Sequence, residues 1–348
     1  MKKIKIVILI LTLFILSSCV NQKENNLKNS NTSDTLLNKN QAVHSNDFYF
    51  VGDVNGRAGI YKYDYGKRSY YKFWSKTNAS VVELSHSPKG NKIFFLTATS
   101  LGKSGVFPFI HNVKLYLLNT DSSNVKFIKL IGSGLQVFTA WETDNSFKVI
   151  LNSFDITVAN YINQHTIIYS EFGRKLVDET KTFDITKEGY PKPPVINKKA
   201  KSPYGEFSIA VKDSPKTSIY LKNAHNKKII VASVPQNLNQ IEWTPENKYL
   251  IFSTINITPR NNTLYNEKPE TSKIFIYSIP DKKIVKEWDG GGLKNFILLK
   301  DLLIFDDGFG KKSSINIFDL KTLQITNSIR IKGGCGIQNI PSIPDYSA

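Results

Sequence analysis

The chain has 348 residues, of which 41% are hydrophobic, and it carries a formal net charge of +17 at pH 7. This length and hydrophobic content allow one large domain to bury a substantial core. The basic charge favours anionic surfaces such as lipid headgroups or acidic glycans and could also suit nucleic acid, but it does not indicate a fold.

The N-terminus has the layout of a bacterial export signal. Lys2, Lys3 and Lys5 accompany an apolar run over 6–16, and two serines stand before Cys19. The run is too short for a permanent membrane-spanning helix. The end of the segment resembles a lipobox, which implies that residues 1–18 are removed and that Cys19 becomes the acylated first residue. The alternative is an ordinary secretory signal with an incidental cysteine.

Residues 19–46 are polar, rich in asparagine and free of aromatic residues. A segment of this composition cannot bury enough apolar surface to fold, so we expect a disordered tether with a reach of roughly 30 Å. If Cys19 is acylated, Cys335 has no partner for a disulfide, and burial must stabilise the rest of the chain.

Beyond this tether the sequence alternates in short stretches rich in Ile, Val, Phe and Tyr, which predicts an all-β domain over 47–348. One unit recurs: a strand, a turn with proline followed two positions later by Gly or Asn, and a second strand. It occurs at 84–95, 200–209 and 241–252, and more weakly at 140–150. Proline fixes the first turn dihedral and Gly or Asn supplies a positive φ, so each copy predicts the same hairpin.

A third and a fourth strand follow each copy, with the third at 115–119, 167–170, 219–222, 274–277 and 315–319. Four short antiparallel strands at this spacing predict one blade of a β-propeller. The Pro-x-Gly turn with its apolar strands resembles the repeat of the TolB-like propellers, also called WD40-like repeats. This resemblance implies a propeller that works through protein partners. A β-sandwich, or a pair of them, is the alternative.

Six inner strands are predicted, at 82–87, 136–141, 196–202, 239–244, 295–299 and 337–343. The last inner strand is not followed by a second strand of the same blade. The domain begins at 48–51 with a second strand that no inner strand precedes. We therefore expect 337–343 to pair with 48–51, so that both termini complete one blade and close a six-bladed ring. A degenerate additional blade would make seven.

The connections differ in length between the two faces of the predicted ring. The long ones are 100–111, 154–164, 184–198 and 256–272, and all of them fall on one face. Loops on a rigid scaffold often carry binding residues, and exposed aromatic residues and arginine contribute most to binding. The candidate binding residues are Phe107, Phe109, Tyr161, Tyr190 and Arg260. Neutral drift of surface loops is the alternative.

No catalytic motif stands out. None of the five histidines lies in an HxH or HExxH arrangement, and a Gly-x-Ser-x-Gly motif is absent, so neither a metal nor a cofactor is predicted. We expect His86 and Cys335 to be structural, with the cysteine buried. Trp141 and Trp243 occupy equivalent positions in two repeats, which predicts packing between blades.

The sequence therefore predicts a lipoprotein of the bacterial cell envelope, anchored in the lipid bilayer through Cys19 on the periplasmic or cell-surface side. Its propeller is expected to be a binding or scaffold module for an envelope protein or an anionic glycan, not for nucleic acid, because the basic residues are dispersed. The alternative is a propeller-type enzyme, such as a lyase or a glycan-active protein. Such an enzyme would place several His, Asp or Glu side chains around a cavity in the central channel.

Overall fold

The computed structural model describes residues 46–87, 90–104, 107–143, 145–155, 160–188, 191, 201–212, 216–255, 272–290, 295–307 and 313–337. The side chains at 100–109, 255 and 290 lie outside this description. So do the predicted signal and tether, including Cys19, and the candidate residues Tyr190 and Arg260.

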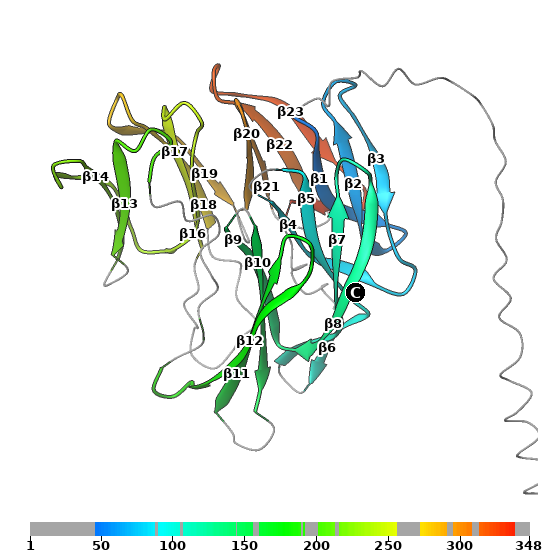
Figure 1. Cartoon of the computed structure of the whole chain (residues 1–348). Coiled ribbons are helices and arrows are strands. Elements are labelled where there is room, and N and C mark those ends of the chain that lie inside the picture. Colours follow the sequence, from blue (N-terminus) through cyan, green and yellow to red (C-terminus); the bar gives the residue numbers. More distant parts are fainter. Residues whose placement is uncertain are drawn as a thin grey trace, which may run out of the picture. The chain divides into compact units, whose positions relative to one another are not determined.

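Six small antiparallel sheets surround a common axis, which is the arrangement of a six-bladed β-propeller (Figure 1). The predictions of an all-β domain and of six blades are confirmed, and the sandwich and the seven-bladed ring are wrong. All described elements are strands, and the described residues include no helix that could cross a membrane.

The strands of each blade are given in order from the axis outward. Blade 1 contains β24 (Cys335–Gly336), β1 (Phe48–Val54), β2 (Arg57–Asp64) and β3 (Ser69–Trp74). Blade 2 contains β4 (Ser80–His86), β5 (Lys92–Ala98), β7 (Phe107–Asn119) and β8 (Asn124–Gly134), with the short β6 (Ser100–Ser104) beside β7. Blade 3 contains β9 (Gln136–Thr143), β10 (Ser146–Phe154), β11 (Tyr161–Ser170) and β12 (Lys175–Asp184).

The second half of the ring follows the same order. Blade 4 contains β13 (Phe207–Lys212), β14 (Thr217–Asn223) and β15 (Lys228–Val234). Blade 5 contains β16 (Asn237–Trp243), β17 (Tyr249–Ile255), β18 (Ser272–Ser278) and β19 (Lys283–Gly290). Blade 6 contains β20 (Phe296–Leu299), β21 (Leu302–Asp306), β22 (Ser314–Asp319) and β23 (Gln324–Arg330). Most of the predicted inner strand at 196–202 lies outside the described residues.

Both ends of the propeller meet in blade 1, where Gly52 and Val51 of β1 pair with Cys335 and Gly336 of β24. The prediction that the two termini close the ring is confirmed, although the pairing residues stand just before the predicted segment 337–343. Of that segment only Ile337 is described, and it is fully buried. The predicted strand begins two residues too late, because 337–343 is more apolar than the glycine-rich segment 333–336.

The recurring turn adopts the expected conformation. Positive φ values of 74°, 74° and 55° occur at Gly90, Gly205 and Asn247. A hydroxyl group adds a feature that the sequence analysis missed. The side-chain oxygens of Ser87, Ser202 and Thr244 accept hydrogen bonds from the amides five residues further on, at 3.1, 3.1 and 2.9 Å. Each hydroxyl therefore fastens the start of the second strand to the end of the first.

Buried apolar clusters lie between neighbouring blades. Trp141 of blade 3 packs against Phe94 of blade 2, with ring centroids 5.3 Å apart, and its indole donates to the carbonyl of Ser85. Trp243 of blade 5 belongs to a cluster with Leu221 of blade 4. The predicted role of both tryptophans in packing between blades is thus confirmed. The clusters of the described residues lie between blades 1 and 2, 2 and 3, 4 and 5, 5 and 6, and 6 and 1, so most of the blade faces in the ring are buried against a neighbour.

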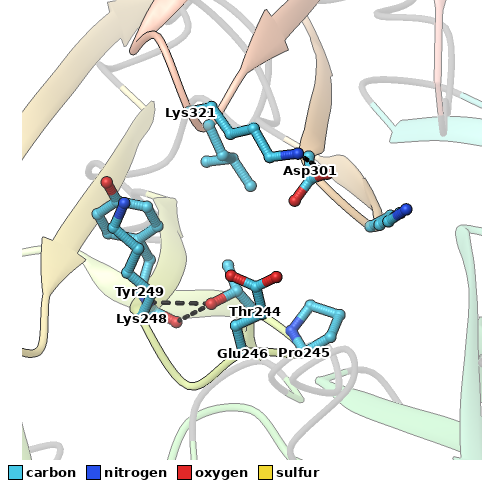
Figure 2. A pocket seen from close by; sticks show the side chains of 9 residues that line it. Thr244, Pro245, Glu246, Lys248, Tyr249, Asp301 and Lys321 are labelled. Atoms are coloured by element: carbon cyan, nitrogen blue, oxygen red, sulfur yellow. Dashed lines mark hydrogen bonds and ion pairs between the residues drawn. The ribbon is translucent and has the colours of Figure 1, made fainter.

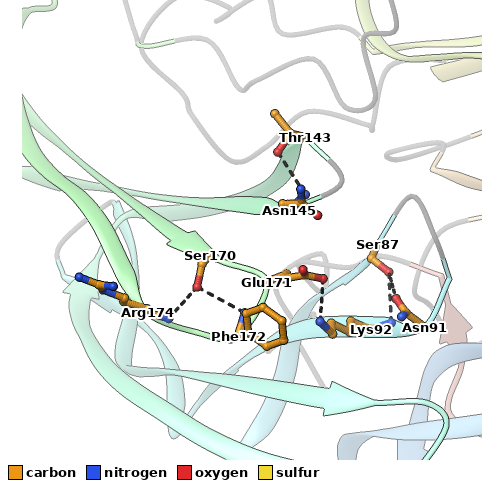
Figure 3. Close-up of polar contacts among 9 residues, drawn as sticks. All are labelled: Ser87, Asn91, Lys92, Thr143, Asn145, Ser170, Glu171, Phe172 and Arg174. Carbon is orange, nitrogen blue, oxygen red and sulfur yellow. Dashed lines mark hydrogen bonds and ion pairs between the residues drawn. The ribbon is translucent and has the colours of Figure 1, made fainter.

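A turn of blade 3 also docks on blade 2 (Figure 3). The Nζ atom of Lys92 lies 2.7 Å from the Glu171 carboxylate and 4.1 Å from the centroid of the Phe172 ring. Lys92 is only 9% exposed, so this ion pair and cation–π contact compensate the loss of water around its ammonium group. Gly173, at φ +83°, lies against the side chain of Ile128. These contacts fix blades 2 and 3 relative to each other.

One of the predicted long connections is largely strand and a second is strand in part, which corrects the sequence analysis. The segment 100–111 forms a hairpin of β6 and β7, and in 154–164 the strands leave only 155–160 as the connection. Ile110 and Val113 are buried in the cluster shared with blade 3, which explains why β7 continues as a strand despite nearby glycines and a proline. The strands of blades 2 and 3 therefore extend together on one side of the ring, at the bottom of Figure 1.

Candidate functional site

Three of the candidate residues from the sequence, Phe107, Phe109 and Tyr161, belong to strands of this extended side, and only Tyr161 has a described side chain. Tyr161 is the first residue of β11. Phe107 and Phe109 lie in β7, at its hairpin with β6, and their side chains are outside the described part. Tyr190 and Arg260 are outside it altogether, so the grouping of the five residues in one site stays a prediction.

Tyr161 takes part in a polar corner at the end of blade 3. Its hydroxyl donates to Oδ2 of Asp184 at 3.4 Å. The same carboxylate accepts a hydrogen bond from the Thr186 hydroxyl at 2.6 Å and pairs with Lys187 at 3.1 Å. The Thr186 hydrogen bond, followed by Lys187, lowers the pKa of Asp184 to about 2. The carboxylate is therefore ionised, and an adjacent ammonium group balances its charge.

A row of amide side chains crosses the same end of blade 3. Gln136, Asn152 and Gln164 stand opposite one another on β9, β10 and β11. The Asn152 amide donates to Oε1 of Gln136 at 3.4 Å, and the Gln164 amide donates to Oδ1 of Asn152 at 3.2 Å. Because each amide group both donates and accepts, the row forms a hydrogen-bonded ladder across three strands.

The other face of the blade carries a second polar row. The Asn163 amide donates to Asp155 at 3.3 Å, and the Thr182 hydroxyl donates to Oδ1 of Asn163 at 2.8 Å. Successive residues of a strand point to opposite faces, so Asn163 and Gln164 belong to different rows. We call the two rows and the Tyr161 corner the amide rim, which comprises Gln136, Asn152, Asp155, Tyr161, Asn163, Gln164, Thr182 and Asp184.

The amide rim differs in kind from the predicted site. The sequence analysis looked for aromatic residues and arginine in loops, whereas four of the eight rim residues are amides within strands. The sequence signal for the rim was the adjacent pair Asn163 and Gln164 near the start of a strand. Adjacent strand residues point to opposite faces, so two polar neighbours indicate that neither face of the strand packs against the core there.

A small cleft lies on the opposite face, between the short turns of blades 5 and 6 (Figure 2). Its volume is about 150 Å³, and it is lined by Thr244, Pro245, Glu246, Lys248, Tyr249, Lys300, Asp301, Leu320 and Lys321. The polar groups of its walls are largely engaged with one another. Lys321 pairs with Asp301 at 2.8 Å, and the Thr244 hydroxyl bonds to the backbone of Tyr249. We assign no ligand to this cleft.

Buried titratable groups lie within the core. Glu83 of β4 is 8% exposed and accepts a hydrogen bond from the Thr139 hydroxyl at 3.0 Å, and burial raises its pKa to about 8. Burial lowers the pKa of His86 to about 3 and raises that of the Cys335 thiol to about 11. Cys335 is fully buried, as predicted. Within the described residues, no three His, Cys, Asp or Glu side chains converge to hold a metal ion.

No protein-family model matches the chain, and neither does any curated protein sequence. Solved structures with a similar fold include TolB from Acinetobacter baumannii, at 12% identity and a TM-score of 0.44, with 84% of this chain and 65% of that chain covered. The periplasmic gluconolactonase PpgL from Pseudomonas aeruginosa matches at 9% identity and a TM-score of 0.47, covering 86% of this chain and 99% of that one. AztD from Citrobacter koseri matches at 10% identity and a TM-score of 0.38, covering 84% and 97%. These similarities concern the propeller fold, and the chain spans only about two thirds of the length of TolB.

Proposed function

We propose that this propeller is a binding or scaffold module for a protein partner, and that it is held at a membrane of the bacterial envelope by an acylated Cys19. The amide rim is the observation that supports the binding role. It places polar side chains at the strand ends of blade 3; Asn152 is buried within the amide ladder, and the other members of the rim are half-buried or exposed.

The chemistry of the rim suits a protein surface. Amide and hydroxyl groups can donate and accept, so they can match backbone as well as side-chain groups of a partner. Tyr161 adds a ring and a polar tip that cost little conformational entropy to order. Interfaces of this composition are polar and hydrated, and they commonly support reversible association. No catalytic step is needed for such a role.

The anchor is supported by the sequence around Cys19. The serine pair before this cysteine ends an apolar run of signal-peptide length. A lipid anchor and a polar tether together confine the propeller near a bilayer, where the local concentration of other envelope proteins is high. The basic charge of the chain adds attraction to anionic headgroups.

Site-specific photocrosslinking tests the binding role. The full chain carries benzoylphenylalanine in place of Tyr161 in one variant and of Tyr204 in the other. Tyr204 is a matched control, because it is exposed in a short turn on the opposite face. We expect irradiation of cells to link another protein to the Tyr161 position and not to the Tyr204 position. Equal products from both positions would place the site elsewhere, and a glycan adduct at position 161 would change the partner class.

Labelling with a fatty-acid analogue tests the anchor separately. Cys19→Ala should abolish incorporation of the label and release the chain from the membrane fraction. Retention of the label in the Cys19→Ala variant would contradict the lipoprotein proposal without affecting the binding role.

A further inference from the structure

Within the described residues, no further strand pairs with the outermost strand of each blade, and β12 is the least protected of these edges. In β3, β8, β15, β19 and β23, β-bulges leave at most five consecutive residues in unbroken register with the inner neighbour. In β12 the bulge lies at the start, and the residues Val177–Asp184 pair with β11 in unbroken register. Bulges and short strands protect edges against pairing with another chain, so β12 offers the longest regular edge among the described outer strands.

The side chains of β12 are also open to a partner. All residues from Lys175 to Thr182 are exposed, including two apolar ones, Leu176 at 54% and Val177 at 37%. Val177, Glu179, Lys181 and Phe183 alternate along one face of the strand, where the Lys181 ammonium lies 4.3 Å from the Phe183 ring centroid. This face therefore combines one acid, one base and two apolar residues.

We propose that β12 pairs antiparallel with β12 of a second copy of this chain, so that blade 3 of each propeller joins a continuous eight-stranded sheet. The charges along β12 are complementary to those of an antiparallel copy of the same strand, which identifies a second copy of this chain as the partner. A two-fold axis through Thr180 places Glu179 opposite Lys181 of the partner and Val177 opposite Phe183, and symmetry repeats each pair.

Charge favours this register over the two neighbouring ones. In a two-fold antiparallel pair one residue must face its own copy, because only then do the paired side chains lie on the same face of the sheet. Shifting the axis to Glu179 opposes two glutamates, and shifting it to Lys181 opposes two lysines. With the axis at Thr180, Asp178 faces Thr182, and Asp178 keeps its contacts with His165 and Lys175.

Single-cysteine crosslinking distinguishes this register from any other contact. In Thr180→Cys the two thiols face each other with Cα atoms about 5 Å apart, within disulfide range. Thr182→Cys is the matched control, since the same change on the same face leaves the thiols about 13 Å apart along the strands. We expect mild oxidation of the purified full chain to give a disulfide dimer with Thr180→Cys and at most background amounts with Thr182→Cys or the unmodified chain.

A charge exchange provides a second test that does not depend on disulfide formation. Lys181→Glu alone or Glu179→Lys alone creates two like-charge pairs and should raise the dimer dissociation constant about tenfold in sedimentation experiments. An equimolar mixture of these two variants restores opposite charges in a heterodimer, so it should regain the original affinity. Lys228→Glu on β15 makes the same charge change on another outer strand and should have no effect.

The outcomes separate the possible occupants of the edge. Selective crosslinking of Thr180→Cys together with recovery in the mixture supports the proposed dimer. A crosslinked product whose mass differs from twice that of the chain would show that another protein occupies β12, and equal crosslinking of both cysteine variants would show a different register. A monomer at all concentrations tested would overturn the proposal and leave the role of the amide rim untouched.

Discussion

The closure of the ring through Ser313 permits a quantitative prediction. The Ser313 hydroxyl is 6% exposed, donates to the Cys335 carbonyl at 2.9 Å and accepts from the Cys335 amide at 3.1 Å. Ser313→Ala removes both bonds and leaves two buried backbone groups without this partner, at a cost of about 1 to 2 kcal/mol each. We therefore expect the free energy of unfolding to fall by about 2 to 4 kcal/mol, a large share of the 5 to 15 kcal/mol typical of folded proteins.

The effect should be visible in thermal and urea unfolding followed by circular dichroism. For a domain of this size, each kcal/mol lowers the melting temperature by about 2 °C, so a decrease of about 4 to 8 °C is expected. Ser122→Ala serves as the control, because Ser122 is exposed in the turn between β7 and β8. If Ser313→Ala changes the melting temperature no more than Ser122→Ala does, the hydroxyl does not hold the C-terminal strand and the reasoning is wrong.

Three further predictions concern the core. Gln240→Leu removes two bonds to the backbone of Phe296 in the next blade, at 2.7 and 3.1 Å, and should destabilise the protein by about 2 to 4 kcal/mol in urea unfolding. The pKa of Glu83 is raised by burial to about 8 in the folded protein against 4.5 for a glutamate in water, so the folded state holds a proton that the unfolded state loses between these values. Stability should therefore decrease as pH rises from about 5 to 8, by at most about 1.4 kcal/mol per pH unit, and Glu83→Gln should flatten this dependence; an equal slope in both proteins would contradict the assignment. Cys335 should react with a thiol reagent only after unfolding, and rapid reaction in the native protein would show that the C-terminal strand opens.

Local sequence patterns were sufficient to predict the blades. The turn at Gly205 and the turn at Asn247 each need a positive φ and a preceding hydroxyl or proline, and these requirements concern residues close together in the chain. The count of blades followed because the pattern repeats. Ring closure was predicted from the strand that blade 1 lacks, which is a property of the fold and not of a motif.

The register of the closing strand and the length of β7 could not be predicted in this way. Both depend on contacts between distant residues: Asp306 accepts from the amide of Ile337, and Val113 is buried against blade 3. The same limit applies to the site. The sequence around Asn152 does not distinguish it from other strand residues. Only the fold places Gln136 and Gln164 on either side of it. A search for single aromatic or basic residues in loops could not detect a surface built from three strands.

Hydrogen bonds between inner strands show how neighbouring blades reach a fixed alignment. Thr139 bonds to Glu83, the Trp141 indole to Ser85, and Gln240 to Phe296, each across a separation of 56 residues. Apolar contacts alone tolerate sliding of one sheet over the next, whereas a buried polar group that loses its partner costs about 1 to 3 kcal/mol. These polar pairs therefore penalise a shift of blade 2 against blade 3 and of blade 5 against blade 6. The rigid alignment of the ring in turn holds the extended end of blade 3 in place, so that a partner can bind the amide rim without first ordering it.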